Sequence, residues 1–400
     1  MLSIVYVSIL FFLVISLLYT YKTKIFINPL LLFYLPFTVE MGIYLLLYYD
    51  DYQISNITIS VITFGMIGFF IGILLAKPIY YDTSTITYCN KRETLVAYQG
   101  TLHFLEVIAI VGYCIAIIEF IRDGLSGVFA NNFLRNVRYS ANYGNDDVFT
   151  FTQYFVLLFY VLSLILMYVD YNTIGKLSPK TKFYILLAMV STMFTMARTI
   201  FISYALSYFC IYDCLKKNNI SFKKIVKYVI ICIVFIIIST QIAIVLSKQG
   251  STSINSEDFW LYKYFGWNII VFDQYFSPYP SVGHGIYSFG IFSRIFEFLP
   301  IYSTKVINSL PEIVGFNTYT YLGSPYRDFG IVGTFLFSVF VGYVSMISFK
   351  KALLNGGYYL IFYSVFCFAC FTAFYANIFF QSYFLYVIII ILILKVIKIR

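Results

Sequence analysis

Residues 323–333, GSPYRDFGIVG, place an arginine beside an aspartate directly before a long apolar run. Arg327 offers a planar, two-pronged donor that suits phosphate or carboxylate, and Asp328 offers a carboxylate that can act as a base. The two side chains are also able to pair with each other, and Asp328 suits the positive N-terminal end of a helix. A reactive site and a charge pair that marks a helix end are therefore both open interpretations of this stretch.

Two further residues combine chemistry with an unusual setting. Arg198 lies between two short apolar runs in TMARTIF, where a charge is costly and calls for a specific purpose. His284 lies in VGHGI, and its flanking glycines allow a ligand to approach the backbone closely. An ordinary surface histidine is the alternative for His284.

The composition is that of an integral membrane protein. Of the 400 residues, 61% are hydrophobic and 11% are charged, and the mean hydropathy is +0.84. Soluble domains have about 45–50% apolar and about 25% charged residues. Residues 2–20 lack a basic start and a small-residue cleavage site, which predicts a retained helix and not a signal peptide. The net charge of +9 is explained by basic inner loops, so no nucleic-acid partner is expected.

Hydropathy predicts an all-α, polytopic helix bundle. A span needs about 20 apolar residues, and the run 182–214 would reach about 50 Å as one helix, beyond a core of roughly 30 Å. That run also carries Arg198 near its middle, so we predict two short spans with Arg198 at the turn between them. About eleven transmembrane helices result. The other nine predicted spans are residues 2–20, 25–49, 56–76, 100–121, 149–169, 223–246, 329–349, 358–378 and 383–398.

Two short motifs inside these spans are assigned to packing. Gly68 and Gly72 form a GxxxG, and Gly65 extends the same small face, which predicts close approach of another helix. Cys367 and Cys370 form a CxxC within an apolar span that has no second ligand pair nearby. We therefore expect neither a metal nor another cofactor.

The distribution of basic residues orients the bundle and singles out arginine. Alternating the spans places eighteen of the 27 Lys and Arg residues on one side, which is cytoplasmic by the positive-inside rule. Only two of these eighteen are Arg, whereas six of the nine on the outer side are Arg. Either cation serves orientation, so the outer excess predicts recognition of phosphate or carboxylate. Pairing with outer acids is the alternative. The six are Arg122, Arg135, Arg138, Arg198, Arg294 and Arg327.

The outer loops are expected to form an active site on the outer face of a single integral-membrane domain, residues 1–400. One external loop covers residues 122–148 and a much larger one covers residues 247–328. The larger loop is too apolar for disorder, so we expect it to fold back as a cap over the bundle. Residues 257–276 within it, which include Trp260 and Trp267, are predicted to form amphipathic helices at the membrane interface.

Outer arginines suit the cleavage of a sugar–pyrophosphate bond. Negative charge develops on the leaving group, and preorganised donors in a partly dry site stabilise it better than water does. The leaving group is already activated, so only a base for the attacking hydroxyl is further required. Arg135 and Arg138, three residues apart, suit an anionic lipid or simple solvation. The candidate phosphate ligands are Arg198, Arg294 and Arg327, and the candidate bases are Asp328, His284 and Glu297.

Residues 316–343, FNTYTYLGSPYRDFGIVGTFLFSVFVGY, resemble the segment that leads into a late helix of Wzy-type oligosaccharide repeat-unit polymerases. In that family a Tyr-x-Asp-Phe-Gly run precedes a glycine-containing span. MARTIF, residues 196–201, is similar to a second family feature, and the plan of many helices with a large late outer loop is shared. The residues matched by motif are Arg198, Tyr326, Asp328 and Gly330, whereas Arg327 and His284 are assigned on physical grounds alone.

The resemblance implies a metal-independent membrane glycosyltransferase with a GT-C-like fold in the bacterial plasma (inner) membrane. Such enzymes transfer a growing glycan from undecaprenyl pyrophosphate to an incoming lipid-linked repeat unit, on the outer face. The product is O-antigen, capsule or another surface polysaccharide. Membrane lipid, a chain-length regulator and a flippase are the further partners that it implies.

Two other functions fit parts of the same pattern. An O-antigen ligase has the same architecture with a loop histidine and arginine, and it differs in its acceptor. A lipid-linked glycan flippase or transporter would instead have charges through the middle of many helices and two similar halves. Acidic residues within the predicted spans are few, among them Glu40, Glu106 and Glu119, and no repeat is visible.

Overall fold

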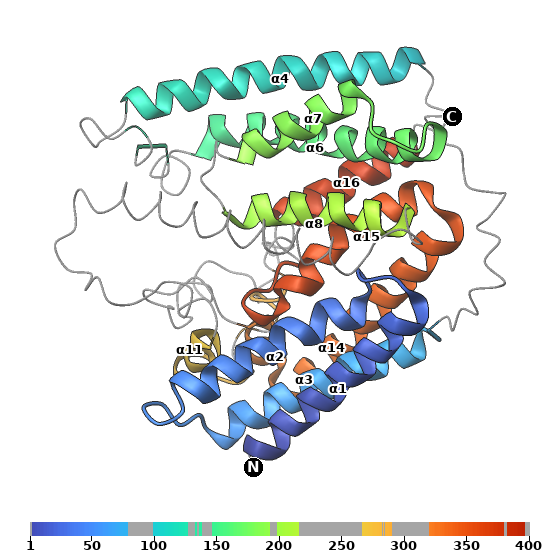
Figure 1. Ribbon diagram of the computed structural model, residues 1–400. Helices are drawn as coiled ribbons and strands as arrows, with labels where there is room; N and C mark the ends of the chain where they lie inside the picture. Colours follow the sequence, from blue (N-terminus) through green and yellow to red (C-terminus); the bar gives the residue numbers. More distant parts are fainter. Residues whose placement is uncertain are drawn as a thin grey trace. The chain divides into compact units, whose positions relative to one another are not determined.

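The computed structural model describes residues 2–78, 99–126, 133, 136–137, 146–192, 198–215, 266–281, 283, 285–289, 320–379 and 382–396, and these contain helices and no strand. Seven of the described helices are long and apolar enough to cross a membrane. The prediction of an all-α, multi-pass membrane protein is therefore confirmed. The helices (Figure 1) are α1 (Leu2–Thr23), α2 (Pro29–Leu47), α3 (Asn56–Leu75), α4 (Gln99–Ser126), α6 (Asp146–Thr173), α7 (Pro179–Ser191), α8 (Arg198–Leu215), α11 (Trp267–Tyr275), α14 (Gly323–Asn355), α15 (Gly357–Phe371), the 3-10 helix η4 (Thr372–Phe374) and α16 (Ser382–Val396).

The helices follow the predicted spans closely where the chain is described. In residues 182–214, α7 ends at Ser191 and α8 begins at Arg198. Residues 193–197 lie outside the described residues, so the turn between two short spans stays a prediction. The 13 residues of α7 extend only about 20 Å, less than a hydrocarbon core of roughly 30 Å. The predicted span 223–246 lies outside the described residues, so the total of eleven helices stays a prediction.

Local sequence explains where several helices begin. Asn28 precedes Pro29, and its side chain accepts the backbone N–H of Leu31 at 3.1 Å, which caps α2. Ser55 caps α3 in the same way, and Ser178 with the following proline starts α7. Polar caps satisfy N–H groups that have no partner within the helix, and proline is preorganised for the first helical position.

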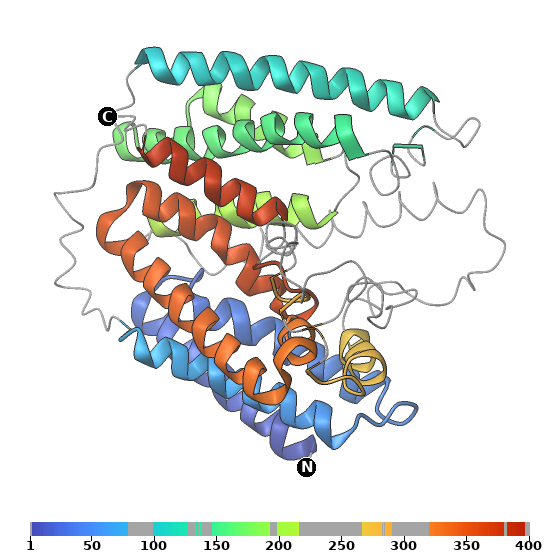
Figure 2. The ribbon, with the colours of Figure 1, turned by 180° about the vertical axis from the view of Figure 1, so that it is seen from behind.

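The chain divides into two compact units. One comprises Met1–Asn90, Glu257–Leu354 and Phe366–Leu385, and the other comprises Lys91–Ser256, Asn355–Val365 and Tyr386–Arg400. In the first unit, α1 packs on α2 and α3, and α11 packs on the same α2 and α3 (Figure 1). In the second unit, α6 packs against α4, α7 and α8, as Figure 2 shows from behind. The prediction of a single integral-membrane domain stays a prediction.

Glycines bring α3 and α14 into close contact within the first unit. A Cβ added at Gly68 would lie 2.7 Å from the carbonyl oxygen of Phe335, and one at Gly72 would lie 2.7 Å from the backbone nitrogen of Tyr343. On the opposite helix, a Cβ at Gly342 would meet the backbone of α3. The predicted packing role of the GxxxG is confirmed.

The start of α14 is anchored in the core of the same unit. The ring of Tyr321, just before the helix, meets the ring of Phe33 edge to face with centroids 5.5 Å apart. Its hydroxyl bonds to Ser338 Oγ at 2.7 Å, and its backbone N–H donates to the carbonyl of Ala373 at 2.9 Å. These contacts set the position of the residues that follow, 323–330.

Candidate functional site

Arg327 and Asp328 lie within a helix and are buried. Sequence placed the helix boundary at residue 329, but α14 begins at Gly323, and each of residues 323–328 is buried. Gly330 interrupts the helix with φ 67° and ψ −159°, a region of backbone space that is essentially restricted to glycine. The short buried turn that carries Arg327 and Asp328 is thereby set off from the long apolar helix after it.

The guanidinium of Arg327 is enclosed by aromatic residues from the preceding loop. Its Cζ lies 4.4 Å from the ring centroid of Phe276, 5.0 Å from that of Tyr287 and 5.7 Å from that of Tyr279. Nη1 donates to the hydroxyl of Tyr287 at 3.0 Å, and Nη2 donates to the carbonyl of Tyr275 at 2.5 Å. Only 1% of the residue is exposed. Cation–π contacts and charged hydrogen bonds together stabilise the guanidinium in this enclosure.

The carboxylate of Asp328 holds the same loop through the backbone. Its Oδ1 accepts the N–H of Tyr287 at 3.1 Å, and its Oδ2 accepts the N–H of Ser288 at 2.6 Å. Asp328 thus bonds to the backbone of the loop and not to Arg327, so the two residues do not form a simple ion pair. The carboxylate fixes the turn that carries Tyr287.

Tyr326 and Gly330 also serve this junction between loop and helix. The Tyr326 hydroxyl donates to the carbonyl of Ser277 at 3.0 Å. The backbone N–H groups of Ser281 and Gly283 donate to the carbonyls of Tyr326 and Arg327, at 3.2 and 2.9 Å. A Cβ at Gly330 would lie 2.9 Å from Ser281 Oγ. The loop and the first turn of α14 therefore form one hydrogen-bonded substructure, and Figure 2 shows the loop running beside that turn.

Helix α11, which leads into this loop, is clamped by two acidic residues. Glu40 of α2 accepts the Asn268 side-chain amide at 3.2 Å and backbone N–H groups at the start of α11. Asp273 of α11 in turn accepts the backbone N–H of Ser55 at 3.0 Å and its hydroxyl at 2.6 Å, and it also bonds to the hydroxyl of Thr58. Each carboxyl group accepts N–H groups at a helix N-terminus, which have no partner within their own helix.

The burial of α11 differs from the expectation for this part of the loop. Residues 257–276 were predicted to form amphipathic helices at the interface, yet Asn268–Phe272 are all buried. Trp267 packs edge to face on Tyr48 and Tyr52, with centroids 5.5 and 5.3 Å away. The nine residues of α11 are too few for their hydrophobic pattern to show whether the apolar side of the helix faces lipid or packs on α2 and α3.

The arrangement can present hydrogen-bond donors and positive charge from within an apolar enclosure. Burial raises the pKa of the Tyr287 phenol, while the charge of Arg327 and its hydrogen bond act in the opposite direction. The phenol is therefore protonated at neutral pH. No group of three His, Cys, Asp or Glu side chains within the described ranges is arranged to hold a metal ion.

The structure brings together only part of the predicted site. Arg327, Asp328, Tyr326 and Gly330 lie in one substructure, and their functional roles stay predictions. Arg198 begins α8 in the other unit, and its side chain is outside the described residues. The remaining candidates also fall outside them: Arg135, Arg138, Arg294, His284, Glu297 and Trp260.

Sequence reasoning missed the loop residues that surround Arg327. Tyr275, Phe276, Tyr279 and Tyr287 supply a carbonyl, three rings and a hydroxyl to one guanidinium. The aromatic density of residues 275–289 was the available signal. The chain is rich in aromatic residues throughout, at 22%, so that signal did not stand out.

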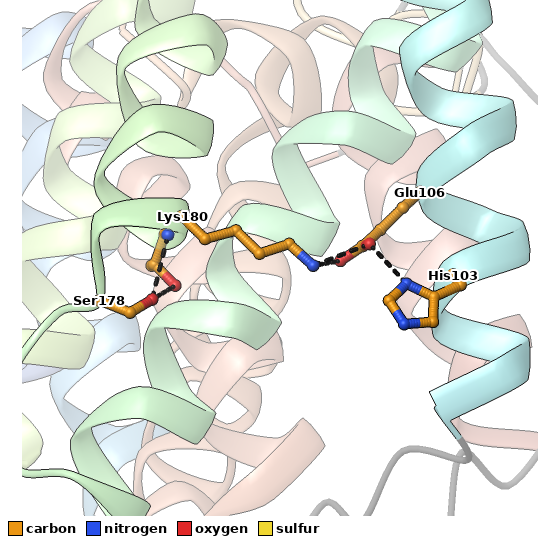
Figure 3. A network of polar contacts seen from close by, with 5 residues as sticks. His103, Glu106, Ser178 and Lys180 are labelled. Atoms are coloured by element: carbon orange, nitrogen blue, oxygen red, sulfur yellow. Dashed lines mark hydrogen bonds and ion pairs between the residues drawn. The ribbon is translucent and has the colours of Figure 1, made fainter.

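The second unit contains a separate polar network between α4 and α7 (Figure 3). Glu106 is buried, and Lys180 Nζ lies 2.6 Å from its Oε1 while His103 Nδ1 lies 3.3 Å from its Oε2. The Lys180 and His103 side chains are respectively 47% and 66% exposed. A buried carboxylate beside a lysine and a histidine is explained by the need to compensate its charge and to satisfy its oxygens, so this network is assigned to joining the helices.

Comparisons of the chain with protein-family models, with curated proteins and with solved structures find no match. Its function is therefore inferred from its residues and their geometry.

Proposed function

We propose that this protein is a membrane glycosyltransferase that polymerises lipid-linked oligosaccharide repeat units. It would transfer a growing glycan from undecaprenyl pyrophosphate to the next repeat unit, in the synthesis of O-antigen, capsule or another surface polysaccharide. The proposal includes about eleven transmembrane helices in a GT-C-like bundle and an active site at the outer face of the bacterial inner membrane. A chain-length regulator and a flippase would be its partners.

The observation that carries the proposal is the enclosure of Arg327 at the start of an apolar helix. A charge buried in a membrane protein is costly and marks functional sites. Here 1% of the residue is exposed, and a folded loop supplies the surroundings of the guanidinium. An arginine held in a partly dry site suits the stabilisation of a pyrophosphate leaving group.

The proposed chemistry needs little beyond that electrostatic assistance. The sugar–pyrophosphate bond breaks, and a hydroxyl of the acceptor sugar attacks the anomeric carbon while a base takes its proton. Asp328, His284 and Glu297 are the proposed bases. Arg198, Arg294, Arg135 and Arg138 are proposed to complete the phosphate and lipid contacts.

Deletion of the gene tests this function directly. Surface glycans and lipid-linked glycans are separated on gels from the deletion strain and from strains complemented with variants. We expect the deletion strain to keep a single repeat unit and to lose the ladder of longer chains. Full-length polymer stranded on its lipid carrier would instead indicate a ligase, and repeat units trapped on the inner leaflet would indicate a flippase.

Complementation with Arg327→Lys extends the test to the proposed site. Lysine keeps the charge but cannot reproduce the fork that reaches both Tyr287 and the Tyr275 carbonyl. We expect shortened or absent ladders from this variant. Arg122→Lys is the matched control, because the Arg122 side chain is 57% exposed beside Asp123 and should tolerate the change. If both variants restore ladders of wild-type length, Arg327 is not part of the site.

A further inference from the structure

The hydrogen bond between Arg327 and Tyr287 has a determined direction. A guanidinium has five N–H donors and no acceptor, so Nη1 donates across the 3.0 Å separation and the Tyr287 oxygen accepts. The proton of the Tyr287 hydroxyl must therefore go elsewhere. Within the described part of the chain, no acceptor takes that proton.

Tyr287 is also the member of the pair that a ligand can reach. Arg327 is 1% exposed, and two of its donors are committed to Tyr287 and to the Tyr275 carbonyl. Tyr287, in contrast, is partly exposed. An anion that approaches this substructure can therefore contact Tyr287 without displacing it, whereas the guanidinium, which lies 5.0 Å from the Tyr287 ring centroid, stays buried.

The position of Tyr287 is set by contacts at both ends of the residue. Its backbone N–H is held by Asp328 at 3.1 Å, and its ring lies over the guanidinium at 5.0 Å. The neighbouring N–H of Gly283 is bonded to the Arg327 carbonyl at 2.9 Å. A donor fixed in this way needs little reorganisation when an anion binds.

We propose that the Tyr287 hydroxyl binds a phosphate oxygen of the lipid-linked substrate, with Arg327 as the buried charge that strengthens the bond and Asp328 as the residue that positions the loop. This inference rests on the function proposed above and names a further ligand of its substrate. Hydrogen bonds from hydroxyl groups to anionic oxygens are short and strong. The Asp328 carboxylate acts here through the backbone of Tyr287.

Binding measurements on the full-length protein in lipid nanodiscs test the proposal. The probes are undecaprenyl pyrophosphate and inorganic pyrophosphate, and the variants are Tyr287→Phe and, as matched control, Tyr279→Phe. The Tyr279 ring also lies over Arg327, at 5.7 Å, so the control removes a hydroxyl and keeps a ring at the same guanidinium. We expect Tyr287→Phe to weaken binding of undecaprenyl pyrophosphate by roughly 10- to 100-fold, and Tyr279→Phe to change it less than about threefold.

The two probes distinguish the source of the phosphate. If Tyr287→Phe loses affinity for both probes to a similar extent, the site binds pyrophosphate itself. If it loses affinity for the lipid-linked probe alone, the site also requires the lipid. Either result supports Tyr287 as a phosphate ligand. Unchanged binding of both probes to Tyr287→Phe, or equal losses in the Tyr279→Phe control, would overturn the proposal.

Replacement of Tyr287 by a fluorinated tyrosine separates binding from a structural role. Fluorination lets the phenol ionise at lower pH, and the phenolate accepts the bond from Arg327 more strongly while it no longer donates to phosphate. We expect pyrophosphate binding to be lost as the pH rises through that lower pKa, with the thermal unfolding midpoint unchanged or raised. If pyrophosphate binding is lost only where the thermal unfolding midpoint also falls, Tyr287 has a structural role only.

The outcomes for this site and for the proposed function are separable. A deletion strain that keeps its glycan ladder would refute the polymerase, whereas weaker pyrophosphate binding by Tyr287→Phe would still establish the phosphate site. A lost ladder in the deletion strain combined with unchanged binding of both probes to Tyr287→Phe would keep the polymerase and refute this role of Tyr287.

Discussion

Replacement of Gly330 by alanine is the sharpest structural perturbation of the Arg327 substructure. Gly330 has φ 67° and ψ −159° and separates the buried turn at 323–328 from the long helix that follows. Alanine adds one methyl group, without charge or polarity, so its effect reports on backbone conformation and space alone. We expect the variant to be destabilised and to shift Arg327 relative to the loop.

Two contributions determine the size of the effect. Forcing a residue with a Cβ into this region of backbone space costs about 1–3 kcal/mol. The added Cβ would lie 2.9 Å from Ser281 Oγ, and overpacking of this kind costs about 1–3 kcal/mol more. The bond from the Ser281 N–H to the Tyr326 carbonyl holds the Ser281 backbone in place, so only rotation of the Ser281 hydroxyl can relieve the contact. The free energy of unfolding should therefore fall by about 2–6 kcal/mol.

A double-mutant cycle with Ser281→Gly separates these contributions. In that background the contact is absent, so Gly330→Ala should cost only the backbone strain of about 1–3 kcal/mol. The measurement is denaturant unfolding of the protein in mixed micelles, with the free energy taken from linear extrapolation. Val332→Ala is the control, because Val332 is 70% exposed and its truncation should change the free energy by less than about 0.5 kcal/mol.

One result would refute this reasoning about Gly330. If the free energy of unfolding of Gly330→Ala lies within about 0.5 kcal/mol of the wild-type value, the positive φ is not required and the interruption of α14 is not an essential feature. If the cost is large but identical in the Ser281→Gly background, the strain is real and the proposed contact is not.

Three further predictions concern other parts of the chain. Arg198→Lys should impair glycan chain growth although the charge is kept, because the fork geometry is lost; a normal ladder would exclude Arg198 from the site. Asp273→Ala should lower the free energy of unfolding by about 1–3 kcal/mol and speed hydrogen exchange in α11, because it removes the bonds that join α11 to the start of α3. Asp51→Ala, at an exposed position, should do neither. Gly72→Leu should prevent close packing of α3 on α14 and lower the yield of folded protein, because its Cβ would meet backbone atoms, while truncation of the 48% exposed Leu74 should be tolerated.

The predicted elements that the structure confirms depend on short-range properties of the chain. Apolar runs of about 20 residues predicted the long helices, because the length of a span follows from the rise per residue and the membrane thickness. The packing of Gly68 and Gly72 on α14 followed from their spacing on one helix face.

The boundary of α14 and the burial of α11 were not predictable in the same way. Hydropathy placed the start of the helix after Asp328, because Arg327 and Asp328 are polar. In the folded protein the loop supplies partners for both side chains, so the polar turn becomes buried helix. The burial of α11 likewise depends on α2 and α3, which contribute Glu40 and the N–H and hydroxyl groups that bind Asp273.

The sequence by itself determined that this is a multi-pass helical membrane protein and that Arg327 and Asp328 precede an apolar helix. Only the tertiary structure decided what these two side chains do. Tyr287, forty residues away in the chain, accepts a bond from Arg327 and gives its backbone N–H to Asp328. Periodicity and hydropathy describe neighbours along one element. The partners of a buried charge instead depend on which distant segments pack around it, because each buried polar group must find a hydrogen bond where water is excluded.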